Sequence, residues 1–386
     1  MNNGKEWRFE SLDSWFFREA RPFNVATSNE LSSVFPPPAR AVAGAVRTLI
    51  GETQGVDWER FARDGEYAEL KRWIGACDDL GDLKITGPYP LWEGKRLYPA
   101  PLHLLAKGSE YVFLQPGAPV ECDLSLDSPR SLGEGPGVRA KKLVRLPTLE
   151  KSLPGAKPLE NAWLNSANLQ QVLCSQCPEK IIRSSTLYDE EPRLGIARNN
   201  AKRTVADGLL YQTRHHRPRP GLGIGVTVSG IPSEQHPEHG IIRFGGEGRP
   251  SAVTVDSAPP RLATPIANGP NVLLVLLTPA DFGGDEWLLP GFKPDMQGDV
   301  KVWRGQLNGV DLVLHCAVLG KAVREGGWDL LHQRPRPVRS LIPAGSVYFC
   351  TVQGNYQGAI DALHGQHIGH DTALGRGELA IGSWKS

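Results

Sequence analysis

The chain has 386 residues, of which 40% are hydrophobic and 22% charged, and its formal net charge at pH 7 is +1. This length allows two or three domains with hydrophobic cores, and the composition excludes a largely disordered protein. The near-zero net charge argues against a protein that coats DNA over its whole surface, but it is compatible with a local RNA site.

Targeting signals and membrane spans are not evident. The longest apolar run, Val272–Leu277, is far shorter than the roughly 20 residues that a membrane-spanning helix needs. The beginning of the chain has no apolar segment of signal-peptide length, and six cysteines in a chain this long do not indicate a disulfide framework. We therefore expect a cytoplasmic protein that does not associate with membranes.

The first predicted element is a strand over residues 7–12, followed by the loop DSWFFREARPF at 13–23. A loop that mixes aromatic side chains with arginines suits base stacking and phosphate contact. The alternative is an aromatic plug, with Arg18 and Arg21 in surface ion pairs.

A helix and a strand pair are predicted next. Prolines 36–38 can begin a helix that continues to residue 50, and residues 57–74 predict a second amphipathic helix. Residues 85–92 and 96–105 predict a pair of strands, and their prolines favour a sheet edge because proline cannot donate a ladder hydrogen bond.

The centre of the chain concentrates positive charge. Residues 192–230 contain seven Lys or Arg and a single acid, Asp207. Because residues 209–211 and 224–228 predict strands, the basic residues should lie on a rigid sheet edge. This pattern predicts a groove for a single-stranded polyanion, and the alternative is a solvated basic loop.

The remaining elements indicate an α+β fold. Residues 163–173 predict a short helix, residues 241–249 a strand ending in a glycine turn, and residues 272–278 a buried strand. Strands and helices in mixed order favour ferredoxin-like modules. A domain boundary within 146–157 gives an N-terminal module at 1–150 and a C-terminal module with a glycine-rich loop at 151–386.

Several short motifs suggest other chemistry. Gly221–Gly225 lacks the following helix of a dinucleotide loop, and Asp281-Phe282-Gly283 lacks the partner motifs of a kinase. Asp285 and Glu286 end a sequence that resembles the metal-binding turn of polymerase palms, which leaves a nucleotidyl transferase as one hypothesis.

Two further motifs contain metal-ligating residue types. Cys174 and Cys177 form half of a zinc site with no second pair, so we expect no metal and no cofactor. The histidines at 364, 367 and 370 are separated by glycines and predict a flexible surface loop.

Six segments, in order over nearly the whole chain, resemble one known family. They are LDSWFFREARPF, PPPARAVAGAVRTLI, LYPAPLHLL, PRLGIARNNAKRTVADGLLY, IIRFGGEGRP and WDL with PRPVRSLIPAGSVYF. They are similar to the third subunit of the Cmr complex, the type III-B CRISPR RNA-guided effector, which belongs to the RAMP superfamily. The final LGRGELAIG is similar to the superfamily's C-terminal glycine-rich loop, a loop expected to contact RNA.

The resemblance implies two ferredoxin-like modules that grip the 5′ handle of the crRNA within a hetero-oligomeric complex. It also implies docking to the large polymerase-like subunit and to the first backbone RAMP subunit, with no catalytic residues in this chain. Exposed apolar side chains at Trp287 and Trp328 could dock such neighbours, or they could belong to the core.

A fixed RNA sequence is best recognised through splayed bases and paired phosphates. On this basis the residues predicted to contact the handle are Arg18, Arg21, Phe23, Arg40, Arg47, Arg193, Arg198, Asn199, Lys202, Arg203, Arg243, Gly245, Gly246 and Arg249. The alternative function is a RAMP endoribonuclease that processes crRNA precursors with His215 or His216 as general acid or base.

The predicted central groove can be tested by a double substitution. Arg198→Ala combined with Arg203→Ala should weaken handle binding and flatten its salt dependence, because each lost phosphate contact lowers the log–log slope by about 0.7 on single strands. Binding titrations at two salt concentrations measure both effects, and unchanged affinity would count against the groove.

Overall fold

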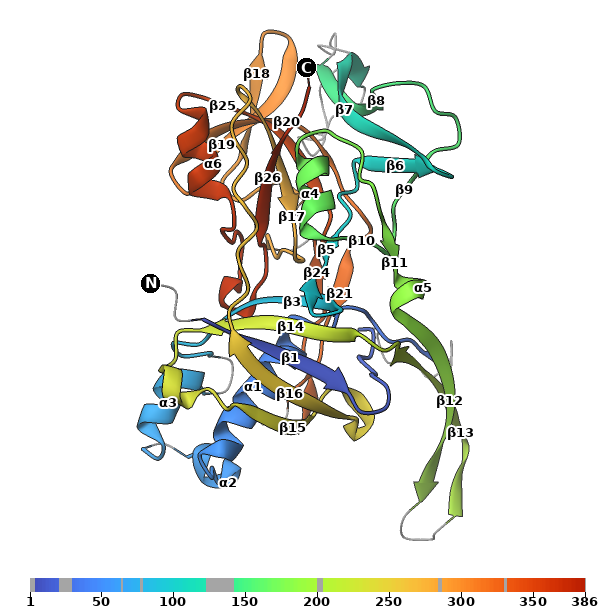
Figure 1. The fold of residues 1–386 in the computed structure, drawn as a ribbon, viewed down its shortest axis with the longest axis vertical. Helices are drawn as coiled ribbons and strands as arrows, with labels where there is room; N and C mark the ends of the chain where they lie inside the picture. Colours follow the sequence, from blue (N-terminus) through green and yellow to red (C-terminus); the bar gives the residue numbers. More distant parts are fainter. Residues whose placement is uncertain are drawn as a thin grey trace, which may run out of the picture.

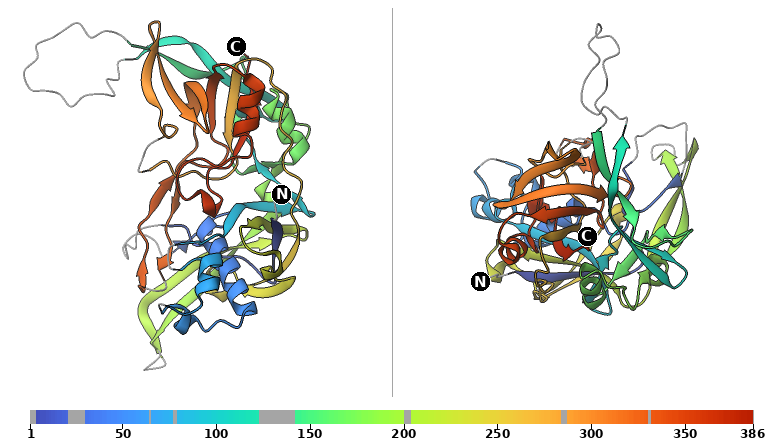
Figure 2. Two further views of the ribbon diagram at one scale, coloured as in Figure 1. Left: turned by 90° about the vertical axis from the view of Figure 1, so that its left-hand side faces the viewer. Right: turned by 90° about the horizontal axis from the view of Figure 1, so that it is seen from above.

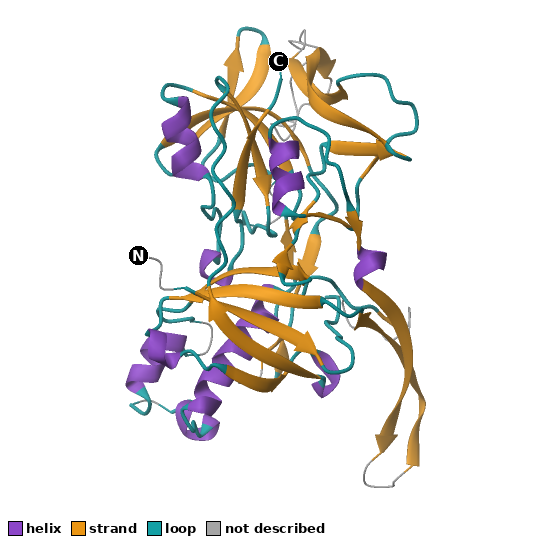
Figure 3. Ribbon diagram, viewed as in Figure 1, coloured by secondary structure: helices purple, strands orange, loops and turns teal. Residues whose placement is uncertain are grey.

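The computed structural model describes residues 4–20, 30–63, 65–76, 79–122, 142–199, 204–283, 287–329 and 332–385. Two lobes are stacked along the long axis of the molecule (Figure 1), and strands far outnumber helices (Figure 3). Each lobe is built on one mainly antiparallel sheet. The predicted α+β class is thereby confirmed in its general form. Within the described residues, no helix combines the length and the apolar character that a bilayer crossing requires.

The lower lobe contains a six-stranded sheet with the first strand of the chain near its centre. The order across the sheet is β15-β16-β1-β14-β3-β4. These strands are β1 (Lys5–Ser11), β3 (Lys84–Trp92), β4 (Lys95–Arg96), β14 (Leu222–Ser229), β15 (His239–Arg243) and β16 (Pro250–Ser257).

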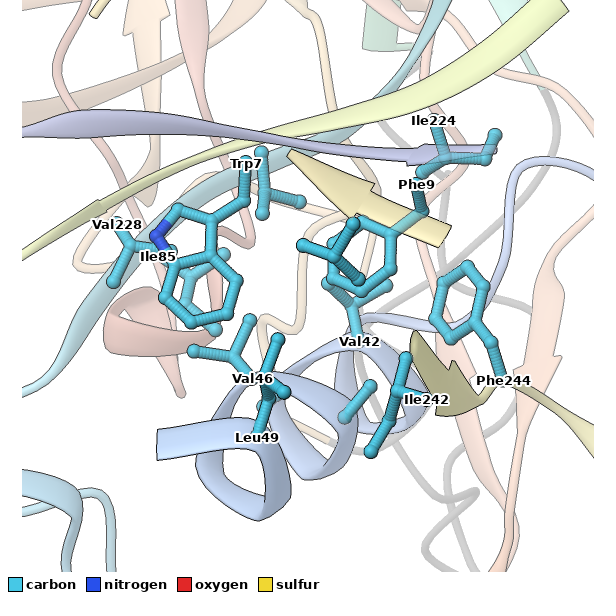
Figure 4. Close-up of a cluster of buried hydrophobic side chains, with 14 of the residues drawn as sticks. Trp7, Phe9, Val42, Val46, Leu49, Ile85, Ile224, Val228, Ile242 and Phe244 are labelled. Atoms are coloured by element: carbon cyan, nitrogen blue, oxygen red, sulfur yellow. The ribbon is translucent and has the colours of Figure 1, made fainter. Parts of the chain in front are cut away.

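Helix α1 (Ala39–Thr53) covers one face of this sheet. Its apolar residues recur at helical spacing, and Val42 and Val46 pack with Trp7 and Phe9 of β1 in one buried cluster (Figure 4). Pro38 stands just before the helix, where its missing N–H costs no intrahelical bond. Both the predicted first strand and the predicted helix are confirmed.

The upper lobe contains a ten-stranded sheet in the order β26-β17-β25-β20-β19-β8-β7-β6-β9, with β18 paired to β19. Its strands are β6 (Leu104–Lys107), β7 (Glu110–Cys122), β8 (Lys142–Leu149), β9 (Lys157–Pro158), β17 (Asn271–Leu276), β18 (Lys293–Gln297), β19 (Val300–Leu307), β20 (Val310–Val318), β25 (Val347–Val352) and β26 (Leu379–Ser383).

Strand β17 is buried on both faces, which explains its continuous apolar sequence. Leu274 packs toward helix α6 (Tyr356–Leu363), whereas Leu273 packs toward helix α4 (Ser166–Leu173). Successive side chains of a strand point to opposite faces, so one strand contributes to two core clusters. The predicted buried strand is confirmed.

Both lobes share one order of strands. In the lower lobe four strands lie side by side in the spatial order β16-β1-β14-β3. Numbered by their order along the chain, they are the fourth, first, third and second strands of this set. In the upper lobe β26-β17-β25-β20 repeat this arrangement. The repeat therefore breaks between β16 and β17, and each sheet draws strands from both sides of residue 150. The division into 1–150 and 151–386 stays a prediction about folding units, but it is not the break that the sheets show.

Smaller elements complete the fold. The remaining strands are β2 (Glu30–Leu31), β5 (Tyr98–Pro99), β10 (Ala162–Leu164), β11 (Ile182–Arg183), β12 (Tyr188–Asn199), β13 (Thr204–Pro218), β21 (Val323–Glu325), β22 (Trp328–Asp329), β23 (Arg334–Pro335) and β24 (Arg339–Leu341). The other helices are α2 (Trp58–Phe61), α3 (Ala68–Ile74), α5 (Ser184–Leu187) and the 3₁₀ helices η1 (Ser233–Gln235), η2 (Gly246–Gly248) and η3 (Thr372–Leu374).

Two predicted elements are shorter than expected. The single helix predicted at 57–74 is two helices, because Gly65 (φ +81°) and Tyr67 (φ +53°) adopt left-handed backbone conformations between them. The strand predicted at 96–105 is broken into β4, β5 and β6, and Pro101, which cannot donate a ladder hydrogen bond, lies in the gap between β5 and β6.

The segment LGRGELAIG begins between the lobes at Leu374 and ends within β26 of the upper sheet. Gly375 approaches Gly87 of β3 so closely that an added Cβ atom would lie 2.2 Å from the Gly87 carbonyl oxygen. The carboxylate of Glu378 accepts a 2.6 Å hydrogen bond from Arg96, which follows β3 in the lower lobe. The beginning of this segment is thus used to fix the two lobes to each other, and its glycines allow backbone to approach backbone.

Buried charges reinforce this contact, which we call the joint. Arg376, only 2% exposed, pairs with Glu325 at 2.5 Å and with Asp371 at 3.0 Å. Arg40 of α1 also pairs with Asp371, at 3.0 Å. Buried ion pairs are costly to break because a single remaining charge is left without compensation, typically at about 3–5 kcal/mol.

Substitution of Gly375 tests the joint. Gly375→Ala should lower the free energy of unfolding by about 2–4 kcal/mol, because the residue has φ +87° and its new Cβ atom would collide with Gly87. Denaturant unfolding measures the change. The matched control is Gly55→Ala, with φ +64° and no atom within 4 Å of the new Cβ, which should cost only about 1 kcal/mol of backbone strain. Equal losses in both variants would contradict the close lobe contact.

Candidate RNA-binding surface

Three arginines surround the carboxylate of Asp13, in the loop that follows β1. Arg193 of β12 lies 2.9 Å from Asp13 Oδ2, Arg249 lies 3.0 Å from the same oxygen, and Arg217 of β13 lies 3.0 Å from Oδ1. The fold thus gathers side chains from three distant segments. Two of them, Arg193 and Arg249, are among the predicted RNA contacts.

Acidic residues balance these arginines. Glu191 pairs with Arg193 at 2.7 Å and also with Arg217, and Glu247 pairs with Arg249 at 3.2 Å. The hydrogen bond from Arg193 holds the pKa of Asp13 below its usual value, and the bond from Arg217 does the same for Glu191. We call these three arginines and three acids the Asp13 cluster; its formal charges cancel.

The strong positive charge expected along residues 192–230 is therefore not present at the base of the hairpin. The residues Asp189, Glu190 and Glu191 directly precede that stretch, and antiparallel pairing of β12 with β13 places Glu191 opposite His215. Diagonal ion pairs result: Arg219 lies 2.7 Å from Asp189, and Arg214 lies 3.1 Å from Glu190. The hairpin register was the signal that sequence reasoning missed.

The predicted glycine turn lies directly against the loop that follows β1. The amide of Gly246 donates a 2.7 Å hydrogen bond to the Phe16 carbonyl oxygen, and Gly245 has φ +92° with that oxygen 2.6 Å from where a Cβ atom would stand. Both glycines therefore allow a close approach within the protein. Arg243, at the start of the turn, is exposed and has no ion pair with a described residue.

The described aromatic residues of the same loop, Trp15, Phe16 and Phe17, are buried and so offer no face for base stacking. Trp15 is fully buried and donates a 3.0 Å hydrogen bond to Ser251, and Phe17 packs edge-on against Phe244. Phe16 is buried too, whereas Arg18 is exposed. The loop is an aromatic plug carrying a surface arginine.

The remaining predicted contacts lie in other settings. Arg40 belongs to the joint, and Arg47 donates to the carbonyl oxygens of Gly75 and Ala76 at 3.1 and 3.2 Å. Arg198 and Asn199 lie on β12, but their side chains are not described. The other four predicted contacts fall outside the described residues: Arg21, Phe23, Lys202 and Arg203. The structure thus gathers Arg193, Arg249 and the glycine turn around the loop that follows β1, while Arg40 and Arg47 hold other parts of the fold together.

The two histidines proposed as acid–base catalysts are buried. His215 is fully buried, stacks on Phe16 and contacts Ser14 and Glu247 at 3.0 and 3.1 Å. His216 is 5% exposed and packs on Tyr188. Burial lowers the pKa of both rings, that of His216 to about 4. Neither ring is positioned to reach a substrate at the surface.

Other motifs have structural partners. Asp281 pairs with Arg339 at 2.8 Å, and Asp285 and Glu286 lie outside the described residues. The expected flexible histidine loop is wrong, because His364 accepts a hydrogen bond from the Ile381 amide and His367 contacts the Arg376 carbonyl oxygen. Cys174 and Cys177 are exposed free thiols. In the described part of the chain, no group of three or more His, Cys, Asp or Glu side chains is arranged to hold a metal ion.

A family comparison decides the relationship. The model of the CRISPR-associated protein family Cas_Cmr3 matches residues 7–384, which is nearly the whole chain. The chain belongs to this family. The resemblance to the third subunit of the type III-B Cmr effector is thereby confirmed.

Solved structures give weaker likenesses to this Cas_Cmr3 protein. A chain of type III-B Cmr-beta bound to cognate target RNA and AMPPnP (state 1, cryo-EM) is 14% identical; the match covers 92% of this chain and 87% of the other, with a TM-score of 0.43. A chain of Cmr-beta bound to cognate target RNA is 15% identical, over 89% and 86%, with a TM-score of 0.45. A chain of the Csm1–Csm4 cassette with AMPPNP is 11% identical, over 89% and 86%, with a TM-score of 0.30.

No curated protein matches the chain. Since the TM-scores of these solved structures are low, the assignment to the Cas_Cmr3 family rests on the family model.

The buried His216 predicts a pH dependence of stability for this Cas_Cmr3 protein. Its pKa is about 4 in the folded state against 6.5 ordinarily, so only the unfolded chain takes up this proton as the pH falls from 6.5 toward 4. The neutral His216 ring makes its full contribution to the free energy of unfolding above pH 6.5. About 2 kcal/mol of this contribution should be lost when the pH falls to 5. Urea unfolding at pH 7.5 and pH 5 should show a smaller acid loss for His216→Phe than for the wild type. Equal losses would contradict the buried neutral ring.

Proposed function

We propose that this Cas_Cmr3 protein is the subunit of a type III-B CRISPR effector that binds and caps the 5′ handle of crRNA. The observation that carries the proposal is the family match across residues 7–384. By this proposal the chain is a non-catalytic scaffold for antiviral defence, and neighbouring subunits cut the target.

The Asp13 cluster offers one physical means of binding RNA. Its carboxylates hold Arg193, Arg217 and Arg249 in place, and Arg217 remains 47% exposed. A guanidinium has five N–H donors, so the exposed Arg217 can donate to a phosphate while it stays paired with Asp13 and Glu191. Arg18 and Arg243 are exposed on segments that meet at the Phe16–Gly246 hydrogen bond, and both add positive charge to this part of the surface.

The strand order supports two ferredoxin-like modules. Each lobe has four strands ordered fourth, first, third, second, with α1 between the first two strands of the lower set and α6 between the last two of the upper set. We infer that the large polymerase-like subunit and the first backbone RAMP subunit dock on these two modules. Exposed apolar side chains such as Ile241 and Trp287 are available for such contacts.

Burial of His215 and His216 favours the scaffold over the endoribonuclease. A general acid or base must come within hydrogen-bonding distance of the reacting group, and both rings instead pack against Phe16 and Tyr188.

Direct RNA binding tests the proposal. The purified full chain should bind a labelled RNA beginning with the repeat-derived 5′ handle more tightly than the same RNA with its handle scrambled. Arg18→Ala combined with Arg243→Ala should lower the affinity for the handle RNA several-fold and reduce its salt dependence. Lys107→Ala combined with Lys157→Ala, exposed cations on β6 and β9 in the upper lobe, is the matched control.

Two results would overturn this function. Equal binding of native and scrambled handles by the wild type would refute handle recognition. Specific cleavage of repeat RNA that disappears in His216→Phe would favour the endoribonuclease.

A further inference from the structure

A two-stranded arm, residues 323–341, extends from the upper lobe along the lower one (Figure 2, left, orange-red). In the arm β21 pairs with β24 and β22 pairs with β23, and the Arg336 amide bonds to the Gly327 carbonyl oxygen between the two ladders. An isolated pair of strands has marginal stability, so it needs an anchor and a surface to lie against.

The inner face of the arm supplies the anchor. Glu325, 8% exposed, pairs with the buried Arg376 of the joint, and Asp329, 7% exposed, accepts hydrogen bonds from the backbone and ring of His332. The bond from the His332 ring holds the pKa of Asp329 at about 2, so this carboxylate stays charged. Glu325 thereby ties the arm to the joint, whereas the contacts of Asp329 with His332 and, at 3.9 Å, with Arg336 lie within the arm.

The exposed side chains of the arm form a different set. Trp328 is 53% exposed, and the exposed Pro335 lies directly opposite it in the strand register. Arg334 precedes Pro335 and lies opposite Asp329; both Arg324 and Arg334 are exposed and form no ion pair with any described residue. An exposed aromatic ring with such cations on the same arm is a combination that suits single-stranded nucleic acid.

The arm and the Asp13 cluster differ in their balance of charge. The arm has four arginines against two acids, whereas the Asp13 cluster has three of each. Arg339 is held by Asp281 and Asp371 in the joint, so the excess positive charge lies toward Arg324 and Arg334. A polyanion is the complementary partner for such a surface.

Trp328 differs from Trp287 in its surroundings. Trp287, 37% exposed, packs edge-on against the partly buried Trp303. Trp328 has no ring contact with a described residue, and the chain near it contains arginines and prolines. Trp and Arg are also frequent in protein interfaces, so the choice of RNA rests on the excess of positive charge on the arm.

We infer that Trp328 stacks on an unpaired base of single-stranded RNA while Arg324 and Arg334 contact the flanking phosphates. The inference rests on the proposed function and adds a second part to its binding surface. The two parts adjoin each other: a Cβ atom on Gly326 would lie 3.2 Å from Ala20, in the loop that also contains Asp13 and Arg18.

The decisive experiment compares intact and base-free RNA. Fluorescence anisotropy with the full chain should show that Trp328→Ala weakens binding of a labelled single-stranded RNA by at least about fivefold, the lower limit for one stacked base. Trp328→Phe should retain most of the affinity, because it keeps an aromatic face. With an abasic RNA of equal length the wild type and Trp328→Ala should bind alike.

Salt dependence tests the two arginines. Arg324→Ala combined with Arg334→Ala should lower the log–log salt slope by about 1.4, for two lost phosphate contacts on a single strand. The matched control, Arg261→Ala combined with Lys293→Ala, removes two exposed cations outside the arm and should leave the slope unchanged.

The outcomes separate this inference from the proposed function. If the wild type binds the RNA and Trp328→Ala binds it equally well, the arm is not a stacking site although the subunit still binds RNA. An equal loss on intact and abasic RNA would also refute stacking. If Trp328→Ala leaves RNA binding intact but loses a neighbouring effector subunit in co-purification, the arm is a protein contact. No RNA binding by the wild type would refute both proposals.

Discussion

The arrangement of the whole molecule depends on how the two lobes are joined. Arg376 is buried and pairs with the buried Glu325 and the partly exposed Asp371, and Gly375 lies against the backbone of Gly87. A buried guanidinium needs compensating acids in fixed positions, and a backbone contact this close accepts no side chain. Together they fix the upper sheet relative to the lower one, and Glu325 connects the arm to the same cluster.

Local structure was largely predictable from the sequence, because it depends on short-range patterns. The alternation of Trp7 and Phe9, the spacing of Val42 and Val46, and the continuous apolar run of β17 each specify an element and its buried face. What the sequence did not reveal was the order of strands. Strands β6, β7, β8 and β9 are close to the N-terminal strands in sequence but complete the upper sheet, so the boundary predicted from the sequence falls between β8 and β9.

The candidate site shows a similar limit. Counting charges along residues 192–230 gave an excess of cations, but pairing of β12 with β13 brings Asp189–Glu191 beside them and cancels much of it. The sequence marks Trp328 only as a possible contact for neighbouring subunits, and it does not single out Arg324 or Arg334. Charge density at a surface follows from strand register and burial, which a linear count does not contain.

The interleaved order of strands has a consequence for synthesis on the ribosome. Strands β7 and β8 emerge early, yet the partner that closes their sheet is β19, where Val300 pairs with Leu143. Until that later segment has been translated, β8 remains an open edge, the kind of surface that attracts incorrect pairing. This edge of the nascent chain therefore stays unpaired until β19 has been made, whereas the lower lobe can already complete its sheet.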